Sequence, residues 1–212
     1  MLAAFIERAG PFEPRDGEGD AFTSLARAIV FQQLAGRAAA AIYGRFAATI
    51  GGTVTADAIL ATAPEQLRAA GLSGNKTLSL IDLATKVRDG TVPLDGIEAL
   101  ADDEIVARLT TVRGIGRWTA EMFLLFELRR PDVWPVDDLG VRNGWSLIHG
   151  LPEMLKPRAL EAEGDRFRPY RSTVALFCWH AVHVDRGQVS PRPPQIRAEA
   201  PLPSRRSSRS GT

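Results

Sequence analysis

Between about residue 20 and residue 185, apolar side chains recur three and four positions apart, which is the spacing of an amphipathic helix. No segment of this region shows the alternation of apolar and polar residues that marks a half-buried strand, and no rhythm of strand and helix runs along it. Glycines close successive helical patterns at Gly51-Gly52, Gly71 and Gly90. The sequence therefore predicts an all-α fold of roughly ten short helices.

Two of the predicted helices have clear beginnings. Asp20 or Thr23 can cap the first, whose apolar pattern continues without a break to Phe46. Asp102 or Asp103 can cap a later helix in the same way. We therefore expect one long helix near the start of the region and a shorter one that begins near residue 102.

The composition excludes several kinds of site. A single cysteine, Cys178, rules out an internal disulfide framework, a cysteine-only zinc site and a four-cysteine iron–sulfur cluster. Three histidines are too few to favour an all-histidine site, so no metal site is predicted. No apolar stretch approaches the length of a membrane span, and residues 1–10 do not read as a signal peptide. A cytoplasmic location, with nucleoid association in a bacterium, is the expectation.

The net charge of +1 is unevenly distributed along the chain. Six arginines and one glutamate give residues 186–212 a net charge of +5, which leaves −4 for residues 1–185. The tail also holds five prolines and cannot bury a core, so residues 186–212 are predicted to be a disordered basic tail. Because the folded part is net acidic, its contacts with a nucleic acid must be local rather than spread over a cationic face.

The most informative segment is residues 109–121, which read Leu-Thr-Thr-Val-Arg-Gly-Ile-Gly-Arg-Trp-Thr-Ala-Glu. One helix is expected to end near Val112 and a second to run from Arg117 to about residue 128. Gly114 and Gly116 permit positive φ and leave backbone N–H groups uncovered, and Ile115 can anchor the hairpin between the helices. Such amides, with the positive end of the second helix, suit a DNA phosphate, although glycines that merely end a helix would read the same.

About twenty residues further on, residues 134–142 read Trp-Pro-Val-Asp-Asp-Leu-Gly-Val-Arg. The hairpin, the intervening helix and this aspartate-bearing loop together resemble the helix–hairpin–helix DNA glycosylase superfamily, and within it the DNA-3-methyladenine glycosylase II group. Residues 29–34, 71–76 and 168–179 agree with that resemblance, which spans roughly residues 20–185.

The resemblance implies two helical lobes with a cleft between them. The glycosylase domain is expected over residues 1–185, with one lobe formed by residues 20–137 and the second by residues 1–19 together with 138–185. The implied partner is double-stranded DNA containing damaged bases, bound by a monomer. No cofactor and no iron–sulfur cluster are required, and a structural monovalent cation at the hairpin is the one ion the resemblance allows.

The implied reaction is hydrolysis of the N-glycosidic bond of alkylated purines of the 3-methyladenine type, flipped out of the duplex, in base excision repair. Relatives that also cleave the strand carry a Schiff-base lysine where this chain has Trp118, so strand-cleaving activity is not expected. Two alternatives stay open: a glycosylase for deaminated or oxidised bases, and a non-catalytic protein that binds DNA lesions through the hairpin.

Asp137 and Asp138 both stand where the superfamily has its catalytic aspartate. Aligning Val141-Arg142 with the Val-Arg pair of these relatives favours Asp138 over Asp137 for the catalytic role, which leaves Asp137 as a neighbour in the base pocket or a helix cap. A carboxylate close to C1′ stabilises the positive charge that develops on the sugar. Capping alone would also explain both aspartates. Trp118 and Trp179 are the candidates for stacking on a cationic purine, and ordinary core packing is the alternative for each.

The candidate DNA contacts fall in two segments. The resemblance implies that Gln33, with Gln32 beside it, fills the gap left by the flipped base. Two solvated helix glutamines are the alternative, but the pair interrupts an apolar face, which favours the wedge. The hairpin supplies the other candidates, which are Arg113, Gly114, Ile115, Gly116 and Thr119. Arg113 departs from the family pattern, which usually has a Leu-Pro pair before the first glycine. An extra phosphate contact is expected there, and a solvated side chain is the alternative.

Overall fold

The computed structural model describes residues 1–10 and 20–187, and within them it contains helices and no strand. The expectations for residues 11–19 and for the tail from residue 188 onward fall outside the described residues. The helices are α1 (Leu2–Ala9), α2 (Ala21–Phe31), α3 (Gly36–Thr49), α4 (Ala56–Leu60), α5 (Pro64–Ala69), α6 (Gly74–Arg88), α7 (Asp102–Leu109), α8 (Arg117–Met122), α9 (Leu139–His149), α10 (Pro157–Gly164) and α11 (Arg171–Asp185). The prediction of an all-α fold is confirmed. No helix of these segments is long and apolar enough to cross a bilayer.

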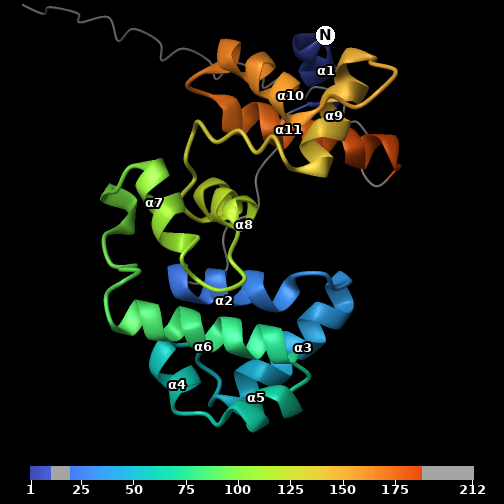
Figure 1. Cartoon of the computed structure of the whole chain (residues 1–212). Helices are drawn as coiled ribbons and strands as arrows, with labels where there is room; N and C mark the ends of the chain where they lie inside the picture. The colour runs from blue at the N-terminus through green and yellow to red at the C-terminus, as the bar shows by residue number, and fades with distance from the viewer. Residues whose placement is uncertain (11–19, 188–212) are drawn as a thin grey trace, which may run out of the picture.

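The helices form two groups, one at each end of the molecule (Figure 1). Helices α2 to α6 lie together at one end, and α1, α9, α10 and α11 lie at the other, with α7 and α8 between the groups. A cavity of about 940 Å³ opens where α7 and α8 face the loop 132–137 and α10. The fold is thus two helical lobes with a cleft, as expected, while the exact boundary at residues 137 and 138 stays a prediction.

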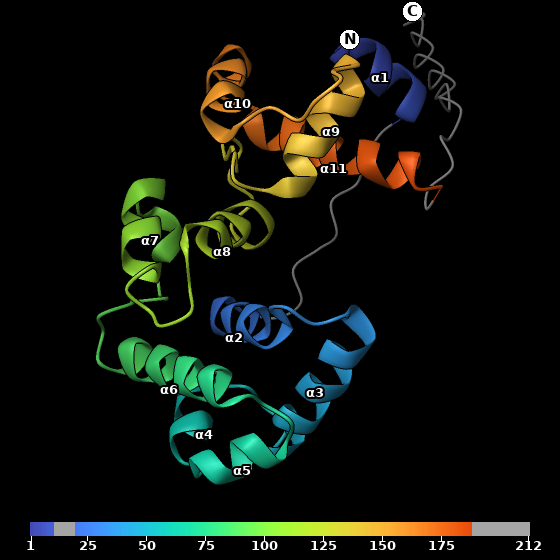
Figure 2. The same cartoon turned by 45° about the vertical axis from the view of Figure 1, so that its right-hand side comes forward.

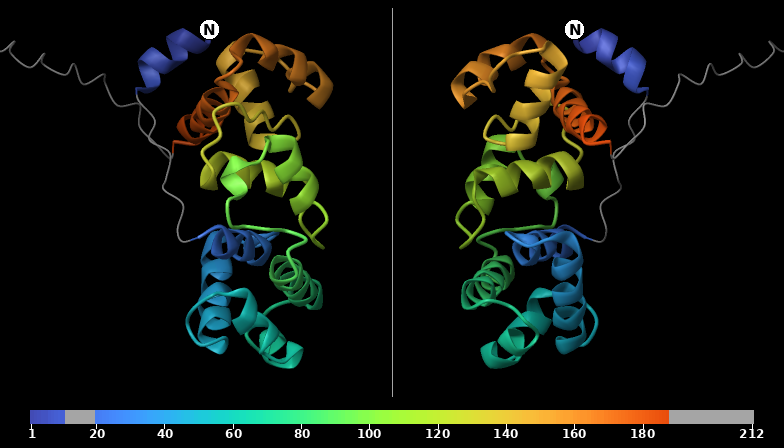
Figure 3. Two further views of the ribbon diagram at one scale, coloured as in Figure 1. Left: turned by 90° about the vertical axis from the view of Figure 1, so that its left-hand side faces the viewer. Right: turned by 90° about the vertical axis from the view of Figure 1, so that its right-hand side faces the viewer.

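The first helix belongs with the end of the described chain rather than with its sequence neighbours (Figure 2). Phe5 of α1 packs edge-on against Phe177 of α11, with ring centroids 6.5 Å apart. Figure 3 shows α1 beside the α9–α11 group from both sides, far from α2. Residues 2–9 therefore complete the lobe that contains the end of the domain.

Helices α9 and α11 make the closest crossing in the second lobe. Gly144 of α9 lies against the backbone of α11, so that a Cβ at this position would come within 1.9 Å of the carbonyl oxygen of Cys178. Buried side chains line both helices, including Val141, Trp145 and Ala175. This tight crossing fixes α11, and with it Trp179, relative to the beginning of α9.

Two predicted features of the helices need correction. Asp20 does cap α2, accepting from the amide of Thr23 at 2.7 Å, but the expected long helix is wrong. It breaks after Phe31, because Gln33 adopts a left-handed φ of +57° that no helix can accommodate. The later helix α7 begins at Asp102 itself and its N-cap is Ala101, so neither aspartate is the cap.

Candidate active site

Asp138 sits at the N-terminus of α9 and gathers hydrogen bonds from three separate parts of the chain. Its Oδ1 accepts from the amide of Val141 at 2.7 Å, which makes Asp138 the N-cap of α9. Oδ1 also accepts from the indole N–H of Trp179 at 2.8 Å, and Oδ2 accepts from the indole N–H of Trp118 at 2.8 Å. With 8 % of its surface exposed, Asp138 is a buried carboxylate whose orientation is set by three donors.

Three donors leave part of the carboxylate available. An ionised carboxylate offers about four lone-pair directions, and Oδ1 receives two of the three donors. Oδ2 therefore keeps the greater capacity to accept a further hydrogen bond, for example from a water molecule. Capping, which was the alternative explanation for this residue, is real, but it uses only one of the three bonds.

The pairing of Trp179 with Asp138 depends on a glycine. A Cβ on Gly140 would lie 2.5 Å from Cδ1 and 2.7 Å from Nε1 of Trp179, distances that real contacts do not reach. Only glycine at this position lets the indole approach the carboxylate. The ring of Trp179 is further held by Phe126, with which it stacks at 5.5 Å between centroids and 28° between planes.

A mostly apolar hollow of about 240 Å³ opens between α2 and α8, lined in part by the Phe126 that stacks on Trp179. Its lining from the α8 side is Thr119, Met122, Phe123 and Phe126, and from α2 it is Ser24, Leu25, Arg27, Ala28 and Phe31. The chain switches from α-helix to a π-helical turn at Phe123–Glu127, which changes the register at which Phe126 leaves the helix. A flat base could be sandwiched among such rings.

Asp137 and Asp138 are neighbours in sequence but lie in different surroundings. Asp137 is exposed and lines the 940 Å³ cleft on the side of α7 and α10. The expectation that Asp137 belongs to the base pocket stays a prediction. Asp137 lies in a turn closed by the bond from the amide of Asp138 to the carbonyl of Pro135 at 3.0 Å, and of the two aspartates it is Asp138 that accepts from both indoles.

The same cleft contains a buried glutamate that the sequence did not single out. Glu121 of α8 has 7 % of its surface exposed and pairs with the guanidinium of Arg117 at 2.9 Å. Burial raises the pKa of Glu121 above its usual range, while Arg117 opposes the shift and the charges of Asp137 and Asp138 add to it. In the sequence, the only signal for Glu121 is its position three residues after Trp118 in the same predicted helix.

The hairpin between α7 and α8 has the expected anchor. Ile115 is buried, and its amide donates to the carbonyl of Val112 at 3.0 Å. Gly114 has a φ of +77°, and a Cβ there would lie 2.6 Å from Oγ of Ser79. Gly116 instead has a φ of −94° and nothing within 4 Å of a hypothetical Cβ, so positive φ is required at the first glycine only.

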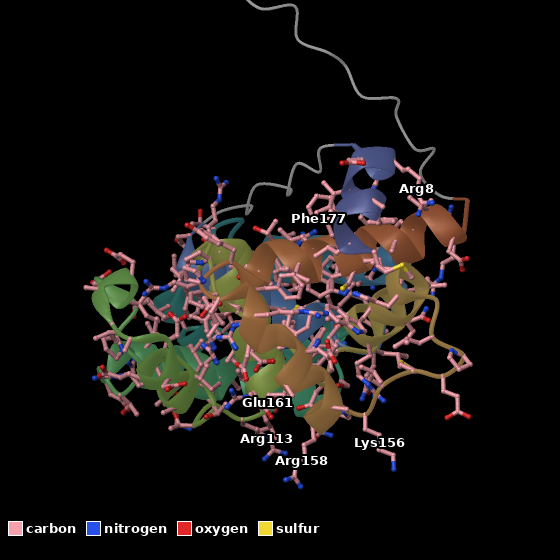
Figure 4. All side chains as sticks on the ribbon, turned by 90° about the horizontal axis from the view of Figure 1, so that it is seen from above. Arg8, Arg113, Lys156, Arg158, Glu161 and Phe177 are labelled. Atoms are coloured by element: carbon pink, nitrogen blue, oxygen red, sulfur yellow. The ribbon has the colours of Figure 1, made fainter. Side chains whose placement is uncertain are left out.

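Arg113 is held in place by helix α6. Its amide donates to Oδ2 of Asp82 at 2.7 Å, and its guanidinium lies 3.3 Å from Oδ1 of Asn75. The side chain is exposed and projects from the same side of the molecule as Lys156 and Arg158 (Figure 4). The structure thus leaves Arg113 accessible to a ligand that approaches the hairpin.

Thr119 does not fit the predicted DNA contact. Only 5 % of its surface is exposed, and it lines the apolar hollow between α8 and α2. It follows Trp118 by one position, and one residue turns a helix by about 100°, which is enough to carry Thr119 from the surface to the interior. Trp118 itself is 46 % exposed.

The two predicted glutamines lie in a turn rather than on a helix face. Gln32 ends α2, and its side-chain amide donates to the carbonyl of Gly114 at 2.9 Å, so that it contacts the hairpin of its own chain. Gln33 is exposed with a left-handed backbone, and the next residue, Leu34, leaves 38 % of its apolar surface in solvent. Leu34 is a functional candidate that the sequence reading missed.

Two further basic residues, Arg171 and Lys76, have partners within the fold. Arg171 forms an ion pair with Asp132 at 2.7 Å. The ammonium of Lys76 donates to the carbonyls of Val30 and Gln32 at 2.7 and 2.8 Å, and burial lowers the pKa of Lys76. Neither side chain is placed to serve mainly as an anion ligand.

The described residues contain no group of three or more histidine, cysteine, aspartate or glutamate side chains able to hold a metal. A monovalent cation at the hairpin would instead use backbone carbonyls. In this chain the carbonyls of Thr111, Val112 and Gly114 accept hydrogen bonds from Lys86, Ile115 and Gln32 respectively. A carbonyl that accepts one hydrogen bond keeps a second lone pair, so a structural cation at the hairpin stays a prediction.

Comparison with known proteins agrees with this geometry. Residues 26–169 match the family described as HhH-GPD superfamily base excision DNA repair protein. DNA-3-methyladenine glycosylase 1 of Schizosaccharomyces pombe is 37 % identical over 179 residues, which cover 82 % of this chain and 78 % of that protein. DNA-3-methyladenine glycosylase 2 of Escherichia coli is 29 % identical over 173 residues, covering 76 % of this chain and 57 % of that one.

Two solved structures are also similar. The DNA-3-methyladenine glycosidase of Bacillus halodurans superposes with a TM-score of 0.82 at 33 % identity, over 88 % of this chain and 86 % of that chain. The 3-methyladenine DNA glycosylase of S. pombe in complex with abasic DNA superposes with a TM-score of 0.75 at 32 % identity, over 90 % and 92 % of the two chains. The similarity therefore extends over both lobes.

Proposed function

Because the chain belongs to the HhH-GPD superfamily of base excision DNA repair proteins, we propose that it is a DNA glycosylase that releases alkylated purines of the 3-methyladenine type from duplex DNA. The observation that carries the proposal is the buried carboxylate of Asp138, oriented by the indoles of Trp118 and Trp179 at the junction of the two lobes. Pure binding of a polyanion would gain nothing from a fixed negative charge at this position.

The reaction breaks the bond between C1′ and the base nitrogen, whose electron pair leaves with the base, and forms a bond from C1′ to a water oxygen. Positive charge develops on the sugar as the base departs. The negative carboxylate of Asp138 stabilises that positive charge, and Oδ2 can accept the proton that the attacking water loses as its oxygen bonds to C1′. A purine that methylation has made cationic leaves as a neutral molecule, so the site does not need a strong acid.

The hollow between α2 and α8 is the proposed seat of the flipped base. Its rings come from Phe31, Phe123 and Phe126, and Trp179 stacks on the last of these. Aromatic faces attract cationic bases through stacking and cation–π forces. Met122 of the same hollow adds a side chain that adapts its shape to the base.

The hairpin and the turn after α2 are the proposed contacts with the DNA itself. The exposed backbone at Gly114 and Gly116, with Arg113 beside it, suits a phosphate. Leu34 and Gln33 stand on the tip of the turn, and apolar side chains are the usual wedges between base steps. We therefore assign Leu34, together with Gln33, to the gap that the flipped base leaves.

The finer proposal is that the enzyme hydrolyses the glycosidic bond without cutting the strand. Trp118 donates its N–H to Asp138 from the position where a Schiff-base amine would be needed. Lys76 and Lys86 are engaged in hydrogen bonds within the fold, and Lys156 lies on the surface just before α10. No lysine of the chain is thereby placed next to Asp138.

The test is to incubate the protein with duplex DNA that carries a single alkylated purine and with DNA treated with a methylating agent, and to measure the free bases by chromatography. We expect release of methylated purines, and no release from untreated DNA. Binding to the alkylated duplex without any base release would contradict the proposal and favour a non-catalytic lesion-binding protein. Release of deaminated or oxidised bases alone would overturn the assigned substrate class.

A further inference from the structure

Three segments that are distant in sequence converge on the turn after α2. From α6, the ammonium of Lys76 donates to the carbonyls of Val30 and Gln32 at 2.7 and 2.8 Å. From the turn, the side-chain amide of Gln32 donates to the carbonyl of Gly114 in the hairpin at 2.9 Å. The turn is therefore tied to α6 through its backbone and to the hairpin through one side chain.

The turn needs these bonds because its conformation is intrinsically unfavourable. Gln33 has a φ of +57°, and a residue other than glycine pays roughly 1–2 kcal/mol to adopt the left-handed region. The local bond that closes the turn, from the amide of Leu34 to the carbonyl of Phe31, is long at 3.3 Å. Contacts from outside the turn must therefore contribute to holding it.

The hairpin offers a rigid partner. Gly114 is fixed by its own left-handed φ of +77° and by Ser79, which leaves no room for a side chain. The turn, the beginning of α6 and the hairpin surround a hollow of about 410 Å³ rather than packing face to face. Gln32 and Gly114 both line this hollow, and the hydrogen bond between them joins the two loops that are proposed to contact DNA.

We infer that Gln32 is a positioning residue that couples the phosphate-binding hairpin to the wedge turn. When the hairpin binds the DNA backbone, the bond from Gln32 sets the depth at which Leu34 and Gln33 enter the duplex. This inference rests on the proposed function, and it replaces the expectation that Gln32 itself contacts DNA. Extruding a base from a duplex costs a few kcal/mol of unpairing and unstacking, and a wedge with no fixed support cannot oppose the return of the base. The bond from Gln32 therefore contributes most to base release when the damaged base is paired.

The test compares two duplexes that carry the same alkylated purine, one opposite a normal base and one opposite an abasic site. In Gln32→Leu, which removes the donor, we expect single-turnover release from the paired duplex to fall about tenfold, the upper range for one net hydrogen bond. Release from the unpaired duplex should change by less than about twofold. Gln32→Glu keeps the shape but has no N–H to donate, and it should reproduce the loss.

Gln66→Leu is the matched control. Gln66 makes a comparable bond from a side chain to a backbone, accepting from the amide of Ala63 at 3.2 Å, but it does so in α5 at the far end of the first lobe. It should leave both rates unchanged. An equal loss on the two duplexes, or a Gln32→Glu variant that behaves like wild type, would overturn the inference.

A second measurement does not depend on base release. With 2-aminopurine next to the damaged base, fluorescence rises when the stack opens, and we expect the rise with the wild-type protein to be largely lost in Gln32→Leu at saturating protein. An equal rise in both proteins, or none in either, overturns the inference. A wild-type protein that opens the stack without releasing the base refutes the proposed function alone.

Discussion

Trp179 donates its indole N–H to Oδ1 of Asp138 at 2.8 Å, although the two residues are 41 positions apart in the chain. The bond joins α11 to the first turn of α9, and the glycine at position 140 leaves the indole room to reach the carboxylate. This bond and the bond from the amide of Val141 both end on Oδ1, while the indole of Trp118 holds Oδ2.

The first prediction follows from that bond. Trp179→Phe keeps an aromatic ring against Phe126 but removes the N–H, and a hydrogen bond to a charged group contributes about 1.5–3 kcal/mol. We expect single-turnover base release, measured well below the melting temperature of the variant, to fall by about ten- to a hundredfold, and the melting temperature to fall by several degrees. Rates equal to wild type would show that Trp179 does not orient Asp138.

The second prediction concerns strand cleavage. Trp118 occupies the position of the lysine that lyase relatives use, so the product should be an intact strand with an abasic site. Borohydride added during the reaction should trap no covalent adduct between protein and DNA, even when base release is complete. A trapped adduct that disappears when Lys76, Lys86 or Lys156 is replaced by methionine would contradict this.

The third prediction tests the crossing of α9 and α11. Gly144→Ala places a methyl group 1.9 Å from the carbonyl oxygen of Cys178, and the helices must separate to accept it. Overpacking of this kind costs about 1–3 kcal/mol or more, which should appear as a lower urea midpoint. In Gly44→Ala, within α3 and with open space around the new Cβ, we expect a gain of up to about 1 kcal/mol. Equal stability of the two variants would refute the close crossing.

The fourth prediction uses the raised pKa of Glu121. Since burial raises this pKa in the folded protein, the native state keeps a proton over a pH range in which the unfolded chain has already lost it. The free energy of unfolding should therefore decrease as the pH rises from the usual glutamate pKa towards the raised value. Glu121→Gln removes this contribution, so its urea stability should fall less over the same range. Identical pH profiles for the two proteins would contradict the shift.

Much of the fold and part of the site could be predicted from local sequence. The hairpin glycines, the buried Ile115 and the N-cap position of the loop aspartate all follow from short-range rules of backbone conformation. The break between α2 and α3 could not be predicted, because the left-handed conformation of Gln33 is supported by Lys76 and Gly114, which lie 43 and 81 residues away along the sequence.

The remaining errors have the same origin. Thr119 follows the site residue Trp118 by one position, and one position decides whether a helical side chain faces the hollow or solvent. The indole bonds to Asp138 bridge 20 and 41 residues, so sequence spacing names the tryptophans but not their orientation. Leu34 was missed because an apolar residue in a helical pattern is usually buried, and only the turn exposes it.

The central claim is that the carboxylate of Asp138 drives base release. The most direct measurement is single-turnover release of a methylated purine by Asp138→Asn and, in parallel, Asp137→Asn, with DNA affinity measured for both. Losing a preorganised charge at the reacting centre should lower the rate for Asp138→Asn about a hundredfold or more while affinity stays close to wild type, and Asp137→Asn should remain active. Full activity of Asp138→Asn, with loss in Asp137→Asn, would contradict the account.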